Sequence, residues 1–188
     1  MNDKILKSAI GSLAKEKINM LIEKAKSDWS ESINEFEKIG YERKPMYLKS
    51  EELEEILKWK LRGQYGRKLK IREKNTDENI EKITKAAFDL THSEFEIETE
   101  LRINTLSVLY GVRTPVATAI LAMCFPKKYA VIDFRNWRQI FGEIKTSFSV
   151  SDYFRYLSEL EVYAEHFSIP IRDMDMAFWQ FDSENNQA

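Results

Sequence analysis

The sequence predicts an all-α fold. Apolar residues recur at helical spacing through most of the chain, and no segment carries a strong strand pattern. Six glycines and four prolines stand as punctuation between the periodic segments. With 188 residues and 43% hydrophobic content, the chain is long enough to bury a core, as one domain or as two lobes sharing one cleft.

The periodic segments predict helices near residues 3–26, 30–39, 50–62, 77–90, 94–108, 115–124, 134–141, 151–167 and 172–181. Pro45 marks the break before the third helix, Gly63 and Gly66 break the basic segment that follows it, and Pro126 ends the helix at 115–124. No repeat, low-complexity region or interdomain linker is present, so residues 1–188 are predicted to form a single domain.

The most informative stretch is the turn at residues 109–115. Gly111 suits a tight turn in which a side chain would hinder the approach of another backbone, and Thr114-Pro115 is a helix-start signal. The open N–H groups of such a turn and the positive end of the helix dipole suit an anion such as a DNA phosphate. The apolar positions Ile97, Leu101, Leu106 and Val108 predict a helix before the turn. The pattern is therefore helix, hairpin, helix over about 94–125, and its predicted DNA contacts are Gly111, Val112, Arg113 and Thr114.

This pattern resembles the helix-hairpin-helix DNA glycosylase superfamily, whose hairpin typically reads Leu-Pro-Gly-Val-Gly before a helix rich in small residues. The matching positions are Leu109, Gly111, Val112, Ala117 and Leu121, and Asp133 falls where the catalytic aspartate of the superfamily lies. The resemblance implies two helical lobes flanking a cleft, with the N- and C-terminal helices forming the second lobe. It also implies an enzyme that hydrolyses the N-glycosidic bond of a damaged or modified base, extruded from double-stranded DNA, for repair or for removal of modified bases.

Three positions depart from the pattern of the superfamily. Tyr110 replaces the usual proline, and Arg113 replaces the second glycine, which either strains the turn or adds a phosphate-binding charge. Pro115 occupies the position at which the lyase members carry their Schiff-base lysine. The resemblance therefore implies a monofunctional glycosylase, in which water attacks the sugar.

Asp133 has two readings that are compatible with each other. It precedes the helical run at 134–140, so it is a candidate N-cap. In glycosylases a carboxylate at such a helix start supports attack of water at C1′ and stabilises the positive charge that develops on the sugar. Trp137, one helical turn further on, is a candidate for the base pocket or for the core.

Other charged residues near the predicted cleft have open roles. Arg135 and Arg138 flank Trp137 and are expected either to contact DNA phosphate or to pair with acidic residues such as Asp152 or Glu143. In the last helix, Arg172 and Asp175 are candidates for the cleft, whereas Met174, Phe178 and Phe181 follow an apolar stripe.

The basic stretch at residues 58–74 is the second candidate DNA contact. It holds eight Lys or Arg and a single Glu, with Trp59 and Tyr65 interleaved. Such a segment suits tracking of a phosphate backbone while an aromatic ring stacks on an extruded base, and Lys60 and Arg62 are its predicted DNA contacts. The alternative is a solvated helix face with Trp59 in the core.

Charge and cysteine content limit the other possibilities. A net charge of −2 argues against broad attraction to nucleic acid, so DNA contacts must come from local clusters.

The single cysteine, Cys124, is expected to be buried and excludes the four-cysteine iron–sulfur cluster of one glycosylase branch. His92 and His166 have no metal-ligand spacing, so neither a metal nor a cofactor is expected. The chain shows no signal peptide or long apolar span, and we expect a cytoplasmic monomer with no membrane partner.

Two alternative functions remain open from the sequence. One is a non-catalytic DNA-binding module that keeps the glycosylase scaffold. The other is a scaffold protein that binds a protein partner and whose hairpin is only structural. Nucleotide hydrolysis and Ser-His-Asp chemistry are disfavoured, because the chain has neither a Walker-type phosphate loop nor a nucleophile elbow.

Overall fold

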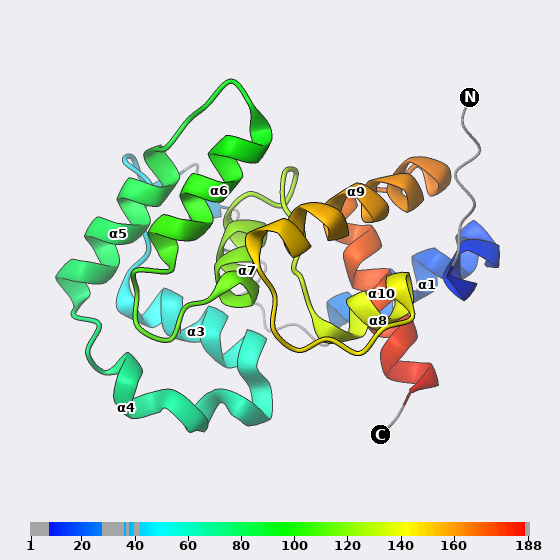
Figure 1. The fold of residues 1–188 in the computed structure, drawn as a ribbon, viewed down its shortest axis with the longest axis horizontal. Helices are drawn as coiled ribbons and strands as arrows, with labels where there is room; N and C mark the ends of the chain where they lie inside the picture. The colour runs from blue at the N-terminus through cyan, green and yellow to red at the C-terminus, as the bar shows by residue number, and fades with distance from the viewer. Residues whose placement is uncertain (1–7, 28–35, 37, 40–41, 187–188) are drawn as a thin grey trace. The chain divides into compact units, whose positions relative to one another are not determined.

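A computed structural model describes residues 8–27, 36, 38–39 and 42–186 of the chain. Its regular secondary structure is helical, with no strand among these residues, which confirms the all-α class. The chain divides into two compact units, one of Glu31–Phe125 and one of Met1–Ser30 with Pro126–Ala188 (Figure 1). Within the same described part, no helix has both the length and the apolar character that crossing a bilayer requires.

The unit of Glu31–Phe125 holds the hairpin. Its elements are α3 (Ser50–Leu61), the 3-10 helix η2 (Arg62–Lys68), α4 (Leu69–Arg72), α5 (Asp77–Asp89), α6 (Phe95–Leu106) and α7 (Thr114–Cys124). Helix α3 packs against α5, α7 and η2, and α6 packs against α5 and α7. The helices α6 and α7 flank the turn, as the sequence predicts.

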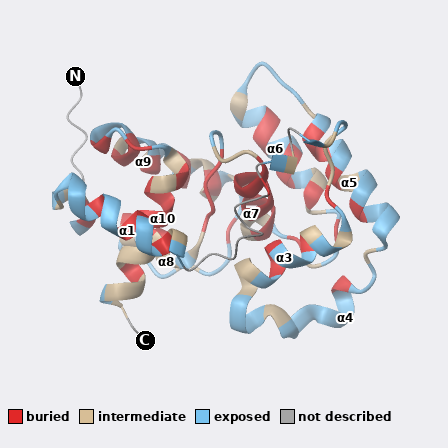
Figure 2. Ribbon diagram, turned by 180° about the vertical axis from the view of Figure 1, so that it is seen from behind, coloured by how far each residue is buried: buried red, intermediate tan, exposed pale blue. Residues whose placement is uncertain are grey.

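Helix α7 is the most deeply buried element of this unit. Proline stands in its first turn, and every residue from 116 to 124 is buried (Figure 2). A helix that is apolar on all sides belongs in a core. The expectation for Cys124 is confirmed, because the residue is buried and burial raises the pKa of its thiol.

The other unit is built around α10 (Ile171–Asn185), which packs against α1 (Lys15–Ser27), α8 (Phe134–Phe141) and α9 (Val150–Phe167). Serine at position 149 and Asp152 form a capping box that starts α9. Within the core, the ring of Tyr163 on α9 meets the ring of Phe178 on α10 edge to face, with 4.9 Å between centroids.

Several helix boundaries differ from the prediction. Of the helix expected at 3–26, residues 3–7 lie outside the described residues. The rest is divided into a 3-10 helix, η1 (Ala9–Ser12), and α1, which begins at Lys15, and Gly11 lowers the helical propensity of the first part. Of the helix expected at 30–39, residues 30–35 and 37 lie outside the described residues, and residues 36, 38 and 39 are helical. Gly63 and Gly66 do not break the chain into a loop but lie within η2.

Candidate functional site

The hairpin is a closed turn between α6 and α7. The Val112 N–H donates to the Leu109 carbonyl at 3.1 Å, and both side chains are buried. Gly111 has φ +83°, in the left-handed region that favours glycine. The prediction that Val112 contacts DNA is wrong for this conformation, because its side chain lies in the core and its N–H is used within the turn.

The backbone leaves open donors where the turn meets α7. Among the hydrogen bonds of the described residues, none uses the N–H of Gly111, Arg113 or Thr114. The helix-start signal Thr114-Pro115 lies in the first turn of α7, whose N-cap residue is Arg113 and has no side-chain cap. The Arg113 carbonyl accepts the N–H groups of Val116 and Ala117, each at 2.9 Å. The N-terminus of α7 therefore has N–H groups that can donate hydrogen bonds to an anion.

The basic segment lies directly against the hairpin. The side chain of Asn75 accepts the Tyr110 N–H at 2.9 Å and donates to the Tyr110 carbonyl at 3.0 Å. The ammonium of Lys74 lies 5.6 Å from the centre of the Tyr110 ring. A Cβ at position 111 would lie 2.6 Å from Cγ of Arg72. Residues separated by 35 positions thus form one surface within this unit.

Gly111 is required for a reason other than the predicted one. The sequence suggests that the missing side chain lets the backbone approach a phosphate. In the structure, the space beside Gly111 holds the stem of Arg72, and the positive φ itself disfavours a side chain. The glycine serves the packing of the basic segment on the turn.

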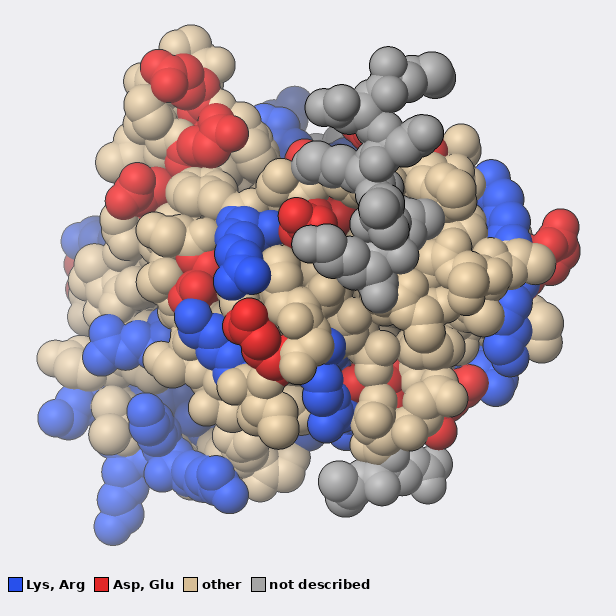
Figure 3. Space-filling view, turned by 45° about the vertical axis from the view of Figure 1, so that its right-hand side comes forward, with Lys and Arg blue, Asp and Glu red and all other residues tan. Residues whose placement is uncertain are grey.

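We call the segment from residue 62 to residue 74 the basic arm. Lys and Arg side chains gather at the lower left of the space-filling view, where η2 and α4 lie (Figure 3). The exposed cations of the arm are Arg62, Arg67, Lys68, Lys70 and Lys74. Arg72 is buried, donates to the Tyr65 carbonyl and lies 4.5 Å above the Tyr65 ring.

Lys60 and Arg62, the two cations predicted to contact DNA, differ in exposure. Lys60 is only partly exposed in the last turn of α3. Arg62 is exposed and has φ +44°, a strained value for a residue with a side chain. Arg62 therefore lies on the surface of the basic arm, whereas Lys60 lies in α3, before the arm.

Trp59 and Tyr65, the aromatic residues predicted to stack on a base, are each only partly exposed. The Tyr65 hydroxyl donates to Glu54 at 2.8 Å, and its ring lies near the cations of Arg72 and Lys58, at 4.5 Å and 5.8 Å. Trp59 is partly buried on α3. Neither offers a freely exposed ring for a base, so their predicted role in a base pocket finds no support in this conformation.

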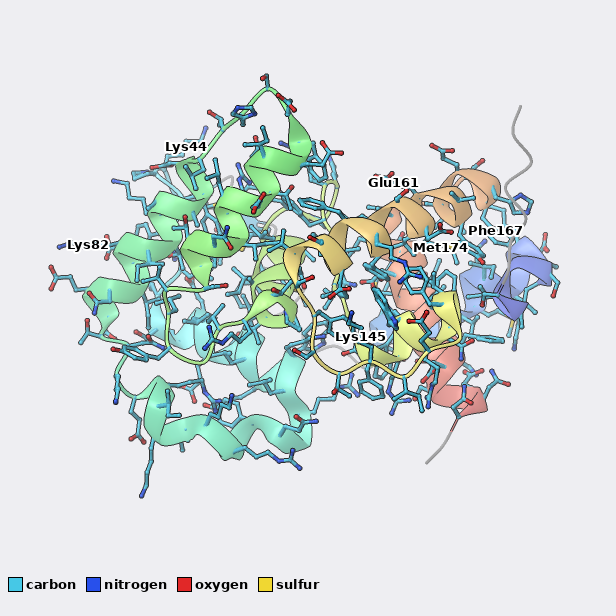
Figure 4. All side chains as sticks on the ribbon, in the orientation of Figure 1. Lys44, Lys82, Lys145, Glu161, Phe167 and Met174 are labelled. Atoms are coloured by element: carbon cyan, nitrogen blue, oxygen red, sulfur yellow. The ribbon has the colours of Figure 1, made fainter. Side chains whose placement is uncertain are left out.

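The prediction of Trp137 as a base-pocket residue is wrong. Its exposed fraction is 0%, and its ring centroid lies 4.2 Å from that of Phe141 and 5.4 Å from that of Phe148. The ammonium of Lys145, which is labelled on the segment after α8 in Figure 4, lies 5.1 Å from the Trp137 ring. Trp137 is a core residue, since α8 directs this face toward the core of its own unit.

Asp133 is the N-cap of α8. One carboxylate oxygen accepts the Arg135 N–H at 3.0 Å, and the residue is partly exposed. The structural reading of Asp133 is thus confirmed, and the catalytic reading stays a prediction.

The segment before Asp133 is held rigidly. Residues 129–132 are all buried. The Tyr153 hydroxyl donates to the Ala130 carbonyl at 3.0 Å and accepts the Ala130 N–H at 3.3 Å. The next N–H, of Val131, donates to the Asp175 carboxylate at 3.1 Å. These three bonds come from α9 and α10 of the same unit, and they fix the backbone of the segment that leads into Asp133.

The carboxylate of Asp175 is buried and accepts hydrogen bonds from several donors. Besides Val131, its carboxylate accepts from the Tyr156 hydroxyl at 2.6 Å, the Asn136 amide and the Arg172 guanidinium. Arg172 and Asp175, the two candidates for the cleft, are both buried. A buried carboxylate with this many donors stabilises the junction between α8 and α10.

Arg135 and Arg138 pair with an acid that the sequence did not suggest. Both donate to Asp182, at 3.1 Å and 2.7 Å, and this carboxylate is fully buried. Burial by itself would raise the pKa of Asp182, but hydrogen bonds from Arg138 and Gln139 outweigh it and lower the pKa.

The acids expected as partners of these arginines pair elsewhere. Asp152 bonds to Lys145 at 2.6 Å, and Glu143 lies 3.9 Å from Arg155.

The histidines lie on the surface. The Nδ1 atom of His92 accepts the Glu94 N–H at 2.9 Å, and His166 stacks edge to face on Phe167. In the portion of the chain that the structure describes, no group of three or more His, Cys, Asp or Glu residues could hold a metal ion.

Comparison of the chain with protein-family models, with curated proteins and with solved structures finds no match.

Proposed function

We propose that this protein binds double-stranded DNA through the hairpin and the basic arm, and that it is a monofunctional DNA glycosylase. The observation that carries the proposal is the seating of the basic arm on the hairpin by Asn75 and Arg72. This seating places the exposed cation of Lys74 at 5.6 Å from the ring centre of Tyr110, the residue before the open N–H of Gly111.

Such a surface suits a phosphate backbone. Backbone N–H groups at a helix N-terminus donate directed hydrogen bonds to one phosphate, and nearby Lys and Arg neutralise the next phosphates. The net charge of the chain is only −2, so the attraction must come from this local cluster. The proposal includes the architecture that the resemblance implies, two helical lobes flanking a cleft.

Asp133 is the residue we propose for the chemistry. It is partly exposed, and the bonds of Tyr153 and Asp175 to the preceding segment hold its backbone in place. In base excision, the bond from C1′ to the base breaks and a bond from C1′ to a water oxygen forms. An ionised carboxylate stabilises the positive sugar and takes a proton from the water.

A non-catalytic DNA-binding protein is the second candidate. It is favoured by one observation, namely that the N-cap bond to Arg135 already gives the Asp133 carboxylate a structural role.

The test uses the full chain and its Asp133→Asn variant. Each is incubated with duplexes that carry different modified bases, and abasic sites are detected as strand breaks after alkali treatment. Asparagine caps a helix about as well as aspartate, so the variant keeps α8 while losing the charge. We expect strand breaks from the wild type with at least one duplex, and none from the variant at similar DNA affinity.

Two outcomes decide against parts of the proposal. DNA binding without any excision, over a panel of common oxidised, alkylated and deaminated bases, would favour the non-catalytic candidate. Absence of DNA binding would overturn the proposal as a whole.

A further inference from the structure

Tyr110 is the aromatic residue that the hairpin exposes. Its side chain is 50% exposed, and that of Val108, two residues earlier in the same turn, is 65% exposed. Leu109 and Val112 are buried, so the turn directs Val108 and Tyr110 into solvent and their neighbours into the core.

The backbone of Tyr110 is fixed by the side chain of Asn75, the residue that follows the basic arm. Its N–H and its carbonyl both bond to Asn75, whose own N–H donates to the Arg72 carbonyl at 2.9 Å. A ring presented from an anchored backbone loses little conformational entropy on binding. An exposed aromatic held in this way is suited to contact a ligand.

The surroundings of the ring are cationic. Lys74 lies 5.6 Å from the ring centre, Arg113 is exposed three residues further on, and the open N–H of Gly111 is on the next residue. A phosphate held by the turn would carry its nucleotide beside the ring. In proteins that bind single-stranded nucleic acid, bases stack on aromatic rings and nearby cations contact the phosphates.

We infer that Tyr110 stacks on an unpaired base of the DNA strand whose phosphate the hairpin binds. The inference rests on the DNA binding proposed above and adds the structural feature of DNA that this surface prefers. A fully paired duplex keeps the faces of its bases stacked on one another, whereas an unpaired base offers a face to Tyr110 at lower free-energy cost.

The other aromatic side chains first considered for this role are less suited to it. The Tyr65 ring is covered by the guanidinium of the buried Arg72 at 4.5 Å, and its hydroxyl donates to Glu54. Trp137 is fully buried. Tyr110 occupies the place of the proline of the superfamily motif, so this contact is a property of the present chain.

The test compares two DNA duplexes of the same length, one fully paired and one with a single unpaired base in the middle. Affinity is measured by fluorescence anisotropy for the wild type, Tyr110→Phe and Tyr110→Ala. The phenylalanine variant is the matched control, because it keeps the ring and removes only the hydroxyl. Because the Asn75 bonds use the Tyr110 backbone, both variants keep them.

We expect the wild type and Tyr110→Phe to bind the duplex with the unpaired base more tightly than the paired one. Tyr110→Ala should lose about ten-fold in affinity for the duplex with the unpaired base, and less for the paired duplex. Circular dichroism and thermal unfolding of each variant check that the fold is intact.

Three results would contradict the inference. The first is equal affinity of the wild type for both duplexes, and the second is an equal loss of affinity for both duplexes in Tyr110→Ala. Either would show that Tyr110 does not stack on an unpaired base, although the protein binds DNA. If the wild type bound neither duplex, the proposed DNA binding would fail, and this inference with it.

Discussion

Gly111 and Arg72 are in contact so close that the glycine has no room for a side chain. A Cβ at residue 111 would lie 2.6 Å from Cγ and 3.1 Å from Cδ of Arg72. Arg72 is itself buried and bonds to the carbonyl of Tyr65. The contact therefore joins the hairpin to the basic arm.

Gly111→Ala should destabilise the protein by roughly 2–3 kcal/mol, because it adds a clash with Arg72 to the strain of φ +83°. Gly142→Ala is the matched control, since Gly142 has φ +70° and nothing within 4 Å of its Cβ position. The control should lose only about 1 kcal/mol. Thermal unfolding measures both, and equal losses would mean that the Arg72 contact yields without cost.

Replacing Lys68 and Lys70 of the basic arm by alanine should weaken DNA binding and reduce its salt dependence. Each lost phosphate contact lowers the slope of log affinity against log salt by roughly one. Lys82→Ala on α5 is the control, because its ammonium is paired with Glu78 at 2.5 Å. The measurement is affinity for one duplex at several salt concentrations. A slope that the double variant leaves unchanged would place these lysines away from the DNA.

The base excision that we propose should proceed without a covalent intermediate. Proline at position 115 has no side-chain amine, and the neighbouring Arg113 and Thr114 cannot form an imine. Borohydride added during the reaction should trap no protein–DNA adduct, and strands should break only after alkali treatment. An adduct mapped to Lys127, Lys128 or Lys60 would show that another lysine acts as the nucleophile.

Asp182→Asn should lower stability at neutral pH by roughly 2–3 kcal/mol, because it leaves the two arginines of α8 without their shared anion. The pKa of Asp182 is lowered on folding, so its carboxylate stabilises the fold above its unfolded pKa of about 3.9. This stabilisation is lost as pH falls through the lower folded pKa. Melting temperatures of the wild type and the variant should therefore converge on acidification. Parallel curves down to pH 2 would contradict this role.

Cys124 should resist thiol reagents in the folded protein. Burial raises the pKa of its thiol, so little thiolate forms, and α7 keeps reagents away. Mass spectrometry after treatment with iodoacetamide at neutral pH should show no adduct on the native protein and one adduct after unfolding in urea. Rapid labelling of the native protein would mean that α7 opens readily.

Local signals in the sequence were enough for the helices and for the position of the hairpin. Proline at 115 and the apolar run after it predict α7, and Asp133 before a helical run predicts an N-cap. These features depend on residues within a few positions of one another, because capping and helical periodicity act over one or two turns.

Only the tertiary structure decided which side chains meet. Asn75 and Tyr110 are 35 residues apart, and Arg138 and Asp182 are 44 apart, so no local pattern could pair them. The burial of Trp137 was decided in the same way, since an aromatic side chain at helical spacing suits a core and a ligand pocket equally well. The sequence by itself determined the all-α class and the approximate positions of most helices, because these follow from short-range backbone preferences. The folded chain determined the candidate surface, because contacts between distant segments depend on how the helices pack.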